Sequence, residues 1–308
     1  MLIALLIIAR AAQIGASMLL VGTFTFELLT LGPAGRPASN DLHEVERRLL
    51  HLAQWSLIAA LLSALLWFWL GVASMNGLPL TRAFSMTAWQ AVLFETEFGH
   101  VWQLRLGLIA VAFVLAALGL ARLRRALILA LFLISLALLI SLAWISHAAA
   151  ARMQPLGLLG DGIHLCAASA WIGGLPPLAI FLARARASFS LSESALPVVR
   201  RFSALSLSCV SVLIVSGISN FWLLVGSIHA LFTTRYGWLL LVKLAAFGVL
   251  VGLGARNRFA IKTKLTRVPT SSDLLAQLRR NVISETCLGV AVVAIVACLG
   301  VTPPARGP

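Results

Sequence analysis

Runs of about 20 apolar residues recur along the whole chain, and this repetition limits the possible folds more than any other feature. A helix of about 20 residues crosses a hydrocarbon core of about 30 Å. Because backbone polar groups inside a bilayer must bond within their own helix, the runs predict an all-α polytopic membrane protein. It is a bundle of eight transmembrane helices with approximate bounds 3–29, 49–72, 101–120, 126–147, 160–182, 203–225, 237–255 and 281–301.

The composition agrees with this class of protein. Of the 308 residues 60% are hydrophobic and 11% are charged, whereas a soluble domain carries about 25% charged residues. The stretch 74–100 is predicted to lie on the membrane surface as a loop with a short helix. The basic stretch 256–280 is predicted to be a solvated connection. Since no soluble domain or repeat stands out, residues 1–308 are interpreted as a single integral-membrane domain.

The basic residues indicate how the chain is oriented in the membrane. Of the 24 Lys and Arg residues, 17 lie in the connections after the first, third, fifth and seventh spans, and four lie in the other connections and the C-terminal tail. Cytoplasmic connections carry an excess of such residues, so both termini are predicted to be periplasmic. The basic residues do not form a stripe interleaved with exposed aromatics. The expected partner is therefore the lipid bilayer and not nucleic acid.

Metal-ligating residue types gather at the predicted outer side. His100 begins the third span, His147 ends the fourth, and His164 lies about one turn inside the fifth. Asp161 precedes His164 by three residues, which places both on one helix face, where the carboxylate can bind the same metal ion or orient the imidazole. Met153 adds a thioether, the ligand type that selects Cu(I). These five residues are the predicted metal ligands of an outer site.

Polar residues inside the spans are candidates for an ion pathway, because ionisable groups at membrane depth are costly. Lys243 is a candidate partner of Asp161, and such a pair would compete with metal binding by the carboxylate. Asn220 and Arg105 lie at a similar outer depth. Trp171 lies two turns beyond His164 on the same helix face, where it either walls the site or simply packs.

Glu285 is predicted about one turn inside the last span, on the cytoplasmic side. An ion pair with Arg201, Arg280 or Arg10 is favoured over a role as an oxygen ligand where a cation leaves the bundle. In the fifth span, the pair 173–174 is expected to allow close helix packing. The prolines at 176–177 are expected to kink that span.

Five segments together resemble a known family. They are "ISHAAA" (145–150), "DGIHLCAASAWIGGL" (161–175), "RRFSALSLSCVSVLIVSGISNFWLLVG" (200–226), "YGWLLLVKLAAFGVLVGLGARNRF" (236–259) and "LRRNVISETCLGVAVVAIVACLGVTPP" (278–304). In this order they resemble the copper resistance protein D (CopD) family of bacterial inner-membrane proteins. The resemblance covers roughly residues 99–304.

The resemblance implies copper transport, with import across the bacterial inner membrane as the expected direction. The copper ion, as Cu(I) or Cu(II), would be captured at the periplasmic site and passed through the bundle. No phosphate-binding loop for ATP hydrolysis appears in the sequence, and no enzyme activity is expected. Some relatives carry a fused copper-binding domain, so a separate periplasmic copper chaperone is an expected partner. Two alternatives stay open: a haem-binding electron-transfer protein, and a copper-binding scaffold that does not transport.

Overall fold

The computed structural model describes residues 1–32, 40–77, 79–83, 85–118, 124–146, 154–267 and 270–305, and the regular structure in these ranges is helical. Eight of the described helical stretches are long and apolar enough to cross a membrane, as predicted. The elements are α1 (Leu2–Thr25), η1 (Phe26–Leu31), α2 (Asn40–Met75), η3 (Leu80–Arg82), α3 (Met86–Glu95), α4 (Glu97–Leu118), α5 (Arg124–Ile140), η5 (Ala143–Ile145), α6 (Gln154–Trp171), α7 (Leu175–Ala185), α8 (Phe189–Leu224), α9 (Ile228–Thr233), α10 (Arg235–Arg256), η7 (Asn257–Ile261), α11 (Lys262–Arg267) and α12 (Ser272–Leu299).

Several helices extend beyond the predicted spans. Helices α2, α8 and α12 begin well before the predicted positions 49, 203 and 281, because hydropathy marks only the part of a helix that suits the lipid interior. The stretch 256–280, predicted to be a solvated connection, is mostly helical, because η7 and α11 continue the path of α10 and α12 begins at Ser272. Residues 263, 264, 266 and 267 are exposed, in agreement with the predicted solvation. The surface helix expected within 74–100 is confirmed as α3.

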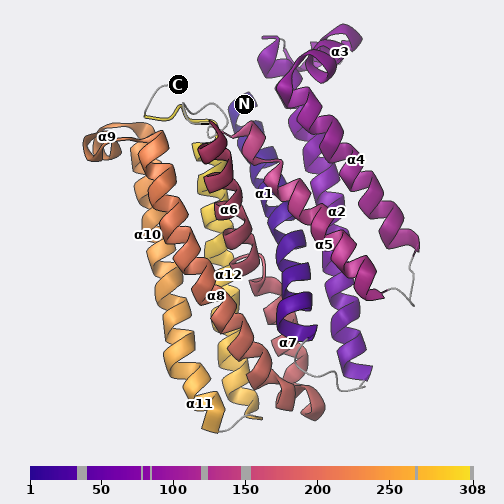
Figure 1. Cartoon of the computed structure of the whole chain (residues 1–308), viewed down its shortest axis with the longest axis vertical. Coiled ribbons are helices and arrows are strands. Elements are labelled where there is room, and N and C mark those ends of the chain that lie inside the picture. Colours follow the sequence, from indigo (N-terminus) through magenta and orange to yellow (C-terminus); the bar gives the residue numbers. More distant parts are fainter. Residues whose placement is uncertain are drawn as a thin grey trace.

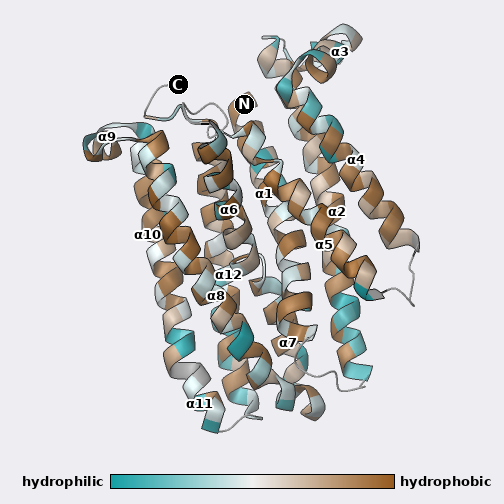
Figure 2. Ribbon diagram, in the orientation of Figure 1, coloured by the Kyte–Doolittle hydropathy of each residue, from teal (hydrophilic) through white to brown (hydrophobic). Residues whose placement is uncertain are grey.

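Helix α1 lies within the bundle and packs against α2, α5, α6 and α12 (Figure 1). Helix α10 lies at the edge, beside α12. The start of α1 and the end of α12 are at the same end of the molecule, and the guanidinium of Arg10 lies against the backbone of Gly300. Figure 2 shows apolar residues along the helices and hydrophilic residues at the lower ends of α2 and α10, away from the chain termini.

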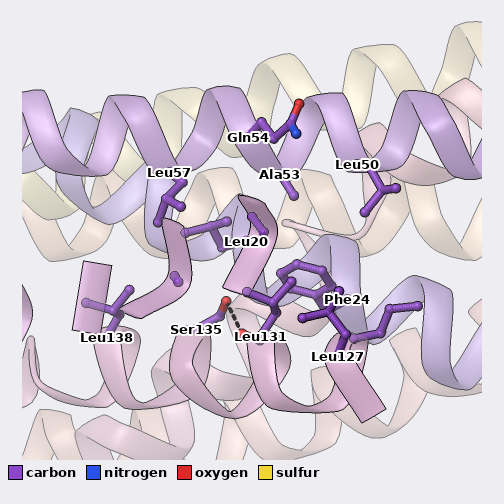
Figure 3. Close-up of a pocket in the computed structure, with 13 residues that line it drawn as sticks. Leu20, Phe24, Leu50, Ala53, Gln54, Leu57, Leu127, Leu131, Ser135 and Leu138 are labelled. Carbon is purple, nitrogen blue, oxygen red and sulfur yellow. Dashed lines mark hydrogen bonds between the residues drawn. The ribbon is translucent and has the colours of Figure 1, made fainter. Parts of the chain in front are cut away.

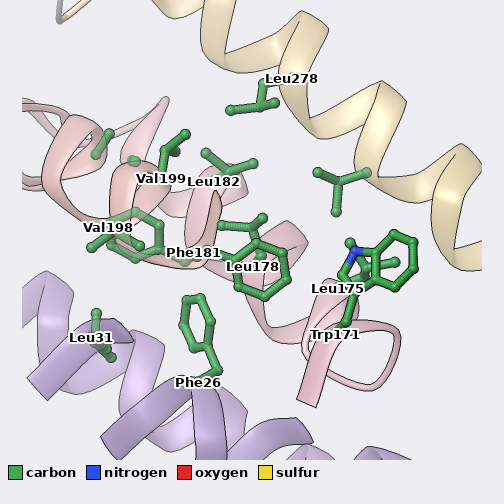
Figure 4. Close-up of a cluster of buried hydrophobic side chains, with 14 of the residues drawn as sticks. Phe26, Leu31, Trp171, Leu175, Leu178, Phe181, Leu182, Val198, Val199 and Leu278 are labelled. Carbon is green, nitrogen blue, oxygen red and sulfur yellow. The ribbon is translucent and has the colours of Figure 1, made fainter. Parts of the chain in front are cut away.

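The fifth span is broken, and the break lies where α1 crosses it. Helix α6 ends at Trp171, residues 172–174 form turns, and α7 begins at Leu175 with prolines in its first turn. A Cβ atom on Gly22 of α1 would lie 2.0 Å from the carbonyl carbon of Gly173. The predicted close packing at this glycine pair is therefore confirmed. The surrounding core, which includes Trp171 and Phe26, is drawn in Figure 4.

Candidate metal site

His164 of α6 faces Ser216 of α8, with 2.9 Å between the imidazole Nδ1 and the hydroxyl oxygen. The Ser216 hydroxyl donates its single proton to the carbonyl oxygen of Val212 at 2.7 Å. The serine oxygen can then only accept, so we assign the Nδ1 proton to His164 as the donor. This tautomer leaves the lone pair on Nε2, the nitrogen with which a neutral imidazole binds a metal ion.

Small residues allow α6 and α8 to approach each other at this level. A Cβ atom on Gly217 would lie 3.8 Å from Cε1 of His164, and a Cβ atom on Gly160 would lie 3.3 Å from Oδ1 of Asn220. The Asn220 oxygen is buried and has no hydrogen-bond partner among the described residues. It lies one turn beyond Ser216 on the same face of α8 and opposite Gly160, which is one turn before His164 on α6.

The Asp161 side chain interacts both with the segment after α5 and with helix α10. The Ser146 hydroxyl lies 2.8 Å from Oδ2 of Asp161 and can donate to it. Electrostatic interactions link Asp161 with Lys243 and Tyr236 of α10, and link Lys243 with His164. The sequence-predicted trio of Asp161, His164 and Lys243 therefore shares one polar cluster, at the end of the bundle that carries the start of α1.

The other predicted residues lie elsewhere or outside the described ranges. His147 and Met153 are among the residues that the structure does not describe. His100 is exposed on α4, with Nε2 3.2 Å from the carbonyl oxygen of Phe94. Arg105 is fully buried between α4 and α5, where it donates to the carbonyl oxygen of Leu138 at 2.6 Å. Within the described ranges, no three His, Cys, Asp or Glu side chains converge on a metal position.

Glu285 differs from the sequence-based interpretation. Its carboxylate is buried and accepts a hydrogen bond from the side chain of Asn257, and among the described residues no ion pair involves it. Arg10 lies against Gly300, 15 residues along α12 from Glu285, or about 22 Å at the helical rise. The proposed partnership with Arg10 is therefore wrong.

Two hollows in the bundle are apolar, and His164 is not among the residues that line them. One of about 250 Å³ lies between α1, α2, α4 and α5, and its wall contains no ionisable side chain (Figure 3). The other, of about 570 Å³, lies between α5, α6 and α8 and is lined by Cys166 and Cys209 together with Trp144, Ser208 and mostly aliphatic residues. The wall of the first hollow contains no His, Cys, Asp or Glu, and among the described residues no third ligand of these types joins the two thiols of the second.

Ser216 is a site residue that sequence reasoning missed. A usable signal existed, because Ser216 precedes Asn220 by four residues and so shares its helix face. Tyr236 and Ser146 carried no such signal, since their proximity to Asp161 depends on how α10 and the α5–η5 corner pack.

Replacing Ser216 by alanine is expected to weaken copper binding about 10-fold, because the imidazole loses the partner that fixes its tautomer and orientation. The affinity of the purified protein for copper would be measured by competition with a chelator. Ser219→Ala is the matched control: Ser219 is exposed on the same helix, and within the described part of the chain its hydroxyl bonds only the Val215 carbonyl oxygen. Equal affinities of the two variants would contradict the assigned role of Ser216.

Two family models match the chain. The model described as "Copper resistance protein D-like, N-terminal domain" matches residues 1–154, which is half of the chain, and "Copper resistance protein D" matches residues 196–299. The first match extends the resemblance beyond the motifs at 99–304 to the first two spans. No solved structure shows a significant match.

Curated relatives with similar sequences carry related names. The chain is 32% identical over 227 residues to "Copper transport protein CutJ" of Bacillus subtilis (strain 168), covering 68% of this chain and 40% of that protein. It is 28% identical to "Copper resistance protein D" of Pseudomonas syringae pv. tomato, covering 70% of this chain and 71% of the relative. It is 30% identical to "Inner membrane protein YebZ" of Escherichia coli (strain K12), covering 70% of both chains.

The chain thus spans less than half the length of the Bacillus relative, but it covers more than two thirds of the other two. The matches to the family models lie in both halves of the chain, and the fold is the eight-span helical bundle that the motifs imply. The chain therefore belongs to the copper resistance protein D family.

Proposed function

We propose that this protein transports copper ions across the bacterial inner membrane, with the His164 cluster as the site of capture. The observation that carries the proposal is the pairing of His164 with Ser216, which leaves the imidazole Nε2 free to bind a metal ion, while Lys243 interacts electrostatically with both His164 and the Asp161 carboxylate. Support comes from the relatives named for copper transport and copper resistance and from the relative named as an inner membrane protein.

Three side chains supply ligands in this proposal: Nε2 of His164, the Asp161 carboxylate and the Asn220 amide oxygen. His147 is the fourth candidate because the sequence predicts it as an outer ligand directly after Ser146. The Lys243 ammonium balances the charge of Asp161 before copper arrives and is displaced when the ion binds. Met153 and His100 are secondary ligands that collect copper near the entrance.

Direction follows from the proposed orientation, in which the end with the termini is periplasmic. A negative potential inside the cell favours inward movement of a cation by about 2.3 kcal/mol per charge per 100 mV. Copper would then move inward without ATP, and no enzymatic step is needed. A periplasmic copper chaperone would deliver the ion to the end of the bundle that carries the His164 cluster.

Transport is tested with purified protein in vesicles that enclose a copper-sensitive chelating dye. We expect external copper to enter vesicles containing the protein at least 10-fold faster than protein-free vesicles, and an inside-negative potential to accelerate entry. Binding without entry would replace the transport proposal with that of a copper-binding scaffold. The optical spectrum of the same preparation checks for haem, whose strong visible absorption would favour the electron-transfer alternative.

A further inference from the structure

The inner half of α10 and α12 holds a second group of polar side chains that the His164 cluster does not include. Glu285 of α12 is 3% exposed and accepts a hydrogen bond from Asn257, the first residue of the π-helix η7. Asn281, one turn before Glu285, donates to the amide oxygen of Asn257 at 2.7 Å. We propose that these three residues, the inner cluster, form a second cation site of this protein, and that it binds Cu(II).

A buried carboxylate without a basic partner favours a cation at this position. Among the described residues, no ion pair involves Glu285, and its hydrogen-bond partner is a neutral amide. A charge taken out of water is costly, so a buried carboxylate either holds a proton or is compensated by another charge, and a cation that binds here takes the place of that proton. The short π-helical turn at Asn257 shifts the helix register there, a feature that is frequent at functional sites. A bound cation would supply the missing charge.

The inner cluster and the His164 cluster lie on one face of α10. Tyr236, Lys243, Leu250 and Asn257 follow each other at intervals of seven residues, which is close to two helical turns. Lys243 belongs to the first cluster and Asn257 to the second. The two residues are 14 positions apart, or about 21 Å along the helix. One helix face therefore connects the two polar sites across the bundle.

An apolar layer separates the two sites. Trp171 is 2% exposed and lies seven residues beyond His164, and Leu250 is fully buried and lies seven residues beyond Lys243. Both belong to one core cluster, and the Trp171 ring meets the Phe247 ring edge-to-face at a centroid distance of 6.1 Å. Because a desolvated ion crosses such a layer only at high cost, the described conformation is closed between the sites.

Trp171 lies at the break of the fifth span, where we propose that the closed layer opens. It is the last residue of α6, directly before the turns at 172–174. Figure 4 shows its ring beside Leu175, the first residue of α7. A side chain at a helix end can move with a local change of the turn, without breaking the hydrogen bonds of a continuous helix. A movement of Trp171 would connect the two polar sites.

The chemistry of the ligands selects the ion. The inner cluster offers carboxylate and amide oxygens, and soft sulfur ligands are what select Cu(I). The thiols of Cys166 and Cys209 line the separate hollow between α5, α6 and α8. Cu(II) is therefore the form of copper that the inner cluster suits. The assignment of the ion rests on the proposed copper function, whereas the existence of a cation site rests on the geometry of Glu285.

The inner site is tested by direct binding of Cu(II) to the detergent-solubilised protein, with electron paramagnetic resonance of the bound ion. We compare His164→Ala with the double variant His164→Ala/Glu285→Gln. The glutamine retains an acceptor for Asn257 but removes the charge, so it is expected to fold. We expect the double variant to bind one Cu(II) fewer. The component of the resonance spectrum that the double variant lacks should show oxygen ligation without coupling to imidazole nitrogen. This component should also be absent when copper is supplied as Cu(I).

A control substitution next to Glu285 and a measurement of copper flux into vesicles complete the test. Ser284→Ala changes an exposed residue of α12 beside Glu285 and is expected to leave binding unchanged. In vesicles, Glu285→Gln alone is expected to slow copper entry at least 10-fold while the affinity of the outer site stays within twofold. Identical Cu(II) stoichiometry with and without the Glu285 carboxylate overturns the inner site, whatever the flux. If removing the Glu285 carboxylate eliminates one bound Cu(II) but the wild-type protein does not transport copper, the inner site is retained and the transport proposal is rejected.

Discussion

Replacing His164 by alanine is expected to weaken copper binding by more than about 100-fold and to abolish copper entry into vesicles. Loss of a group that only orients a ligand costs about 10–100-fold in affinity, so loss of the ligand itself should exceed that range. The remaining Asp161 carboxylate would keep its interaction with Lys243, which competes with a cation. The measurements are chelator competition for affinity and dye-reported entry for flux.

Two substitutions serve as controls for His164→Ala. His229 is an exposed histidine of α9, and its replacement by alanine is expected to preserve at least half of the wild-type entry rate. Cys209 is buried in the core and lines the apolar hollow, so Cys209→Ala is expected to leave outer-side affinity unchanged. Normal copper affinity in His164→Ala would reject the capture site, and a loss in all three variants would indicate a general defect.

Replacing Gly22 by alanine is expected to destabilise the bundle strongly. The new Cβ atom would lie 2.0 Å from the Gly173 carbonyl carbon and 2.3 Å from its oxygen, so backbone must move to accommodate it. Overpacking of a core costs about 1–3 kcal/mol and sometimes more. Because two backbones meet here, we expect the upper end of that range or beyond. The melting temperature in detergent should fall by about 5–10 °C, or the protein should fail to purify as a single species.

A glycine with open surroundings provides the matched control. A Cβ atom on Gly248 of α10 would meet nothing within 4 Å among the described residues. Gly248→Ala is therefore expected to leave the melting temperature unchanged or raise it, since alanine favours a helix over glycine by about 1 kcal/mol. A melting temperature of Gly22→Ala equal to that of Gly248→Ala would show that α1 and the turn at 173 are not in close contact in the folded protein.

The sequence predicted much of the fold because hydrophobic length is a local property. Each apolar run was long enough to identify a span, and each of the eight predicted runs overlaps a membrane-length helix of the structure. The spacing of Asp161 and His164 was also local, and the structure places them in one cluster with Lys243. Hydropathy did not predict how far helices extend beyond the lipid, as at 257–267, because it carries no information about helicity in solvated segments.

The ligand network depends on contacts between residues distant in the sequence, so it needed the tertiary structure. Ser216 is 52 residues from His164, and its hydroxyl oxygen accepts the hydrogen bond that places the imidazole proton on Nδ1. Glu285 illustrates the same limit, because three arginines were reasonable partners by sequence, whereas helix packing placed Asn257 beside it instead. The sequence alone determined the eight-helix class and the face of α6 that carries the candidate metal ligands. Only the packing of α6, α8, α10 and α12 decided which side chains meet, since hydrogen bonds and charges act over a few ångströms in space.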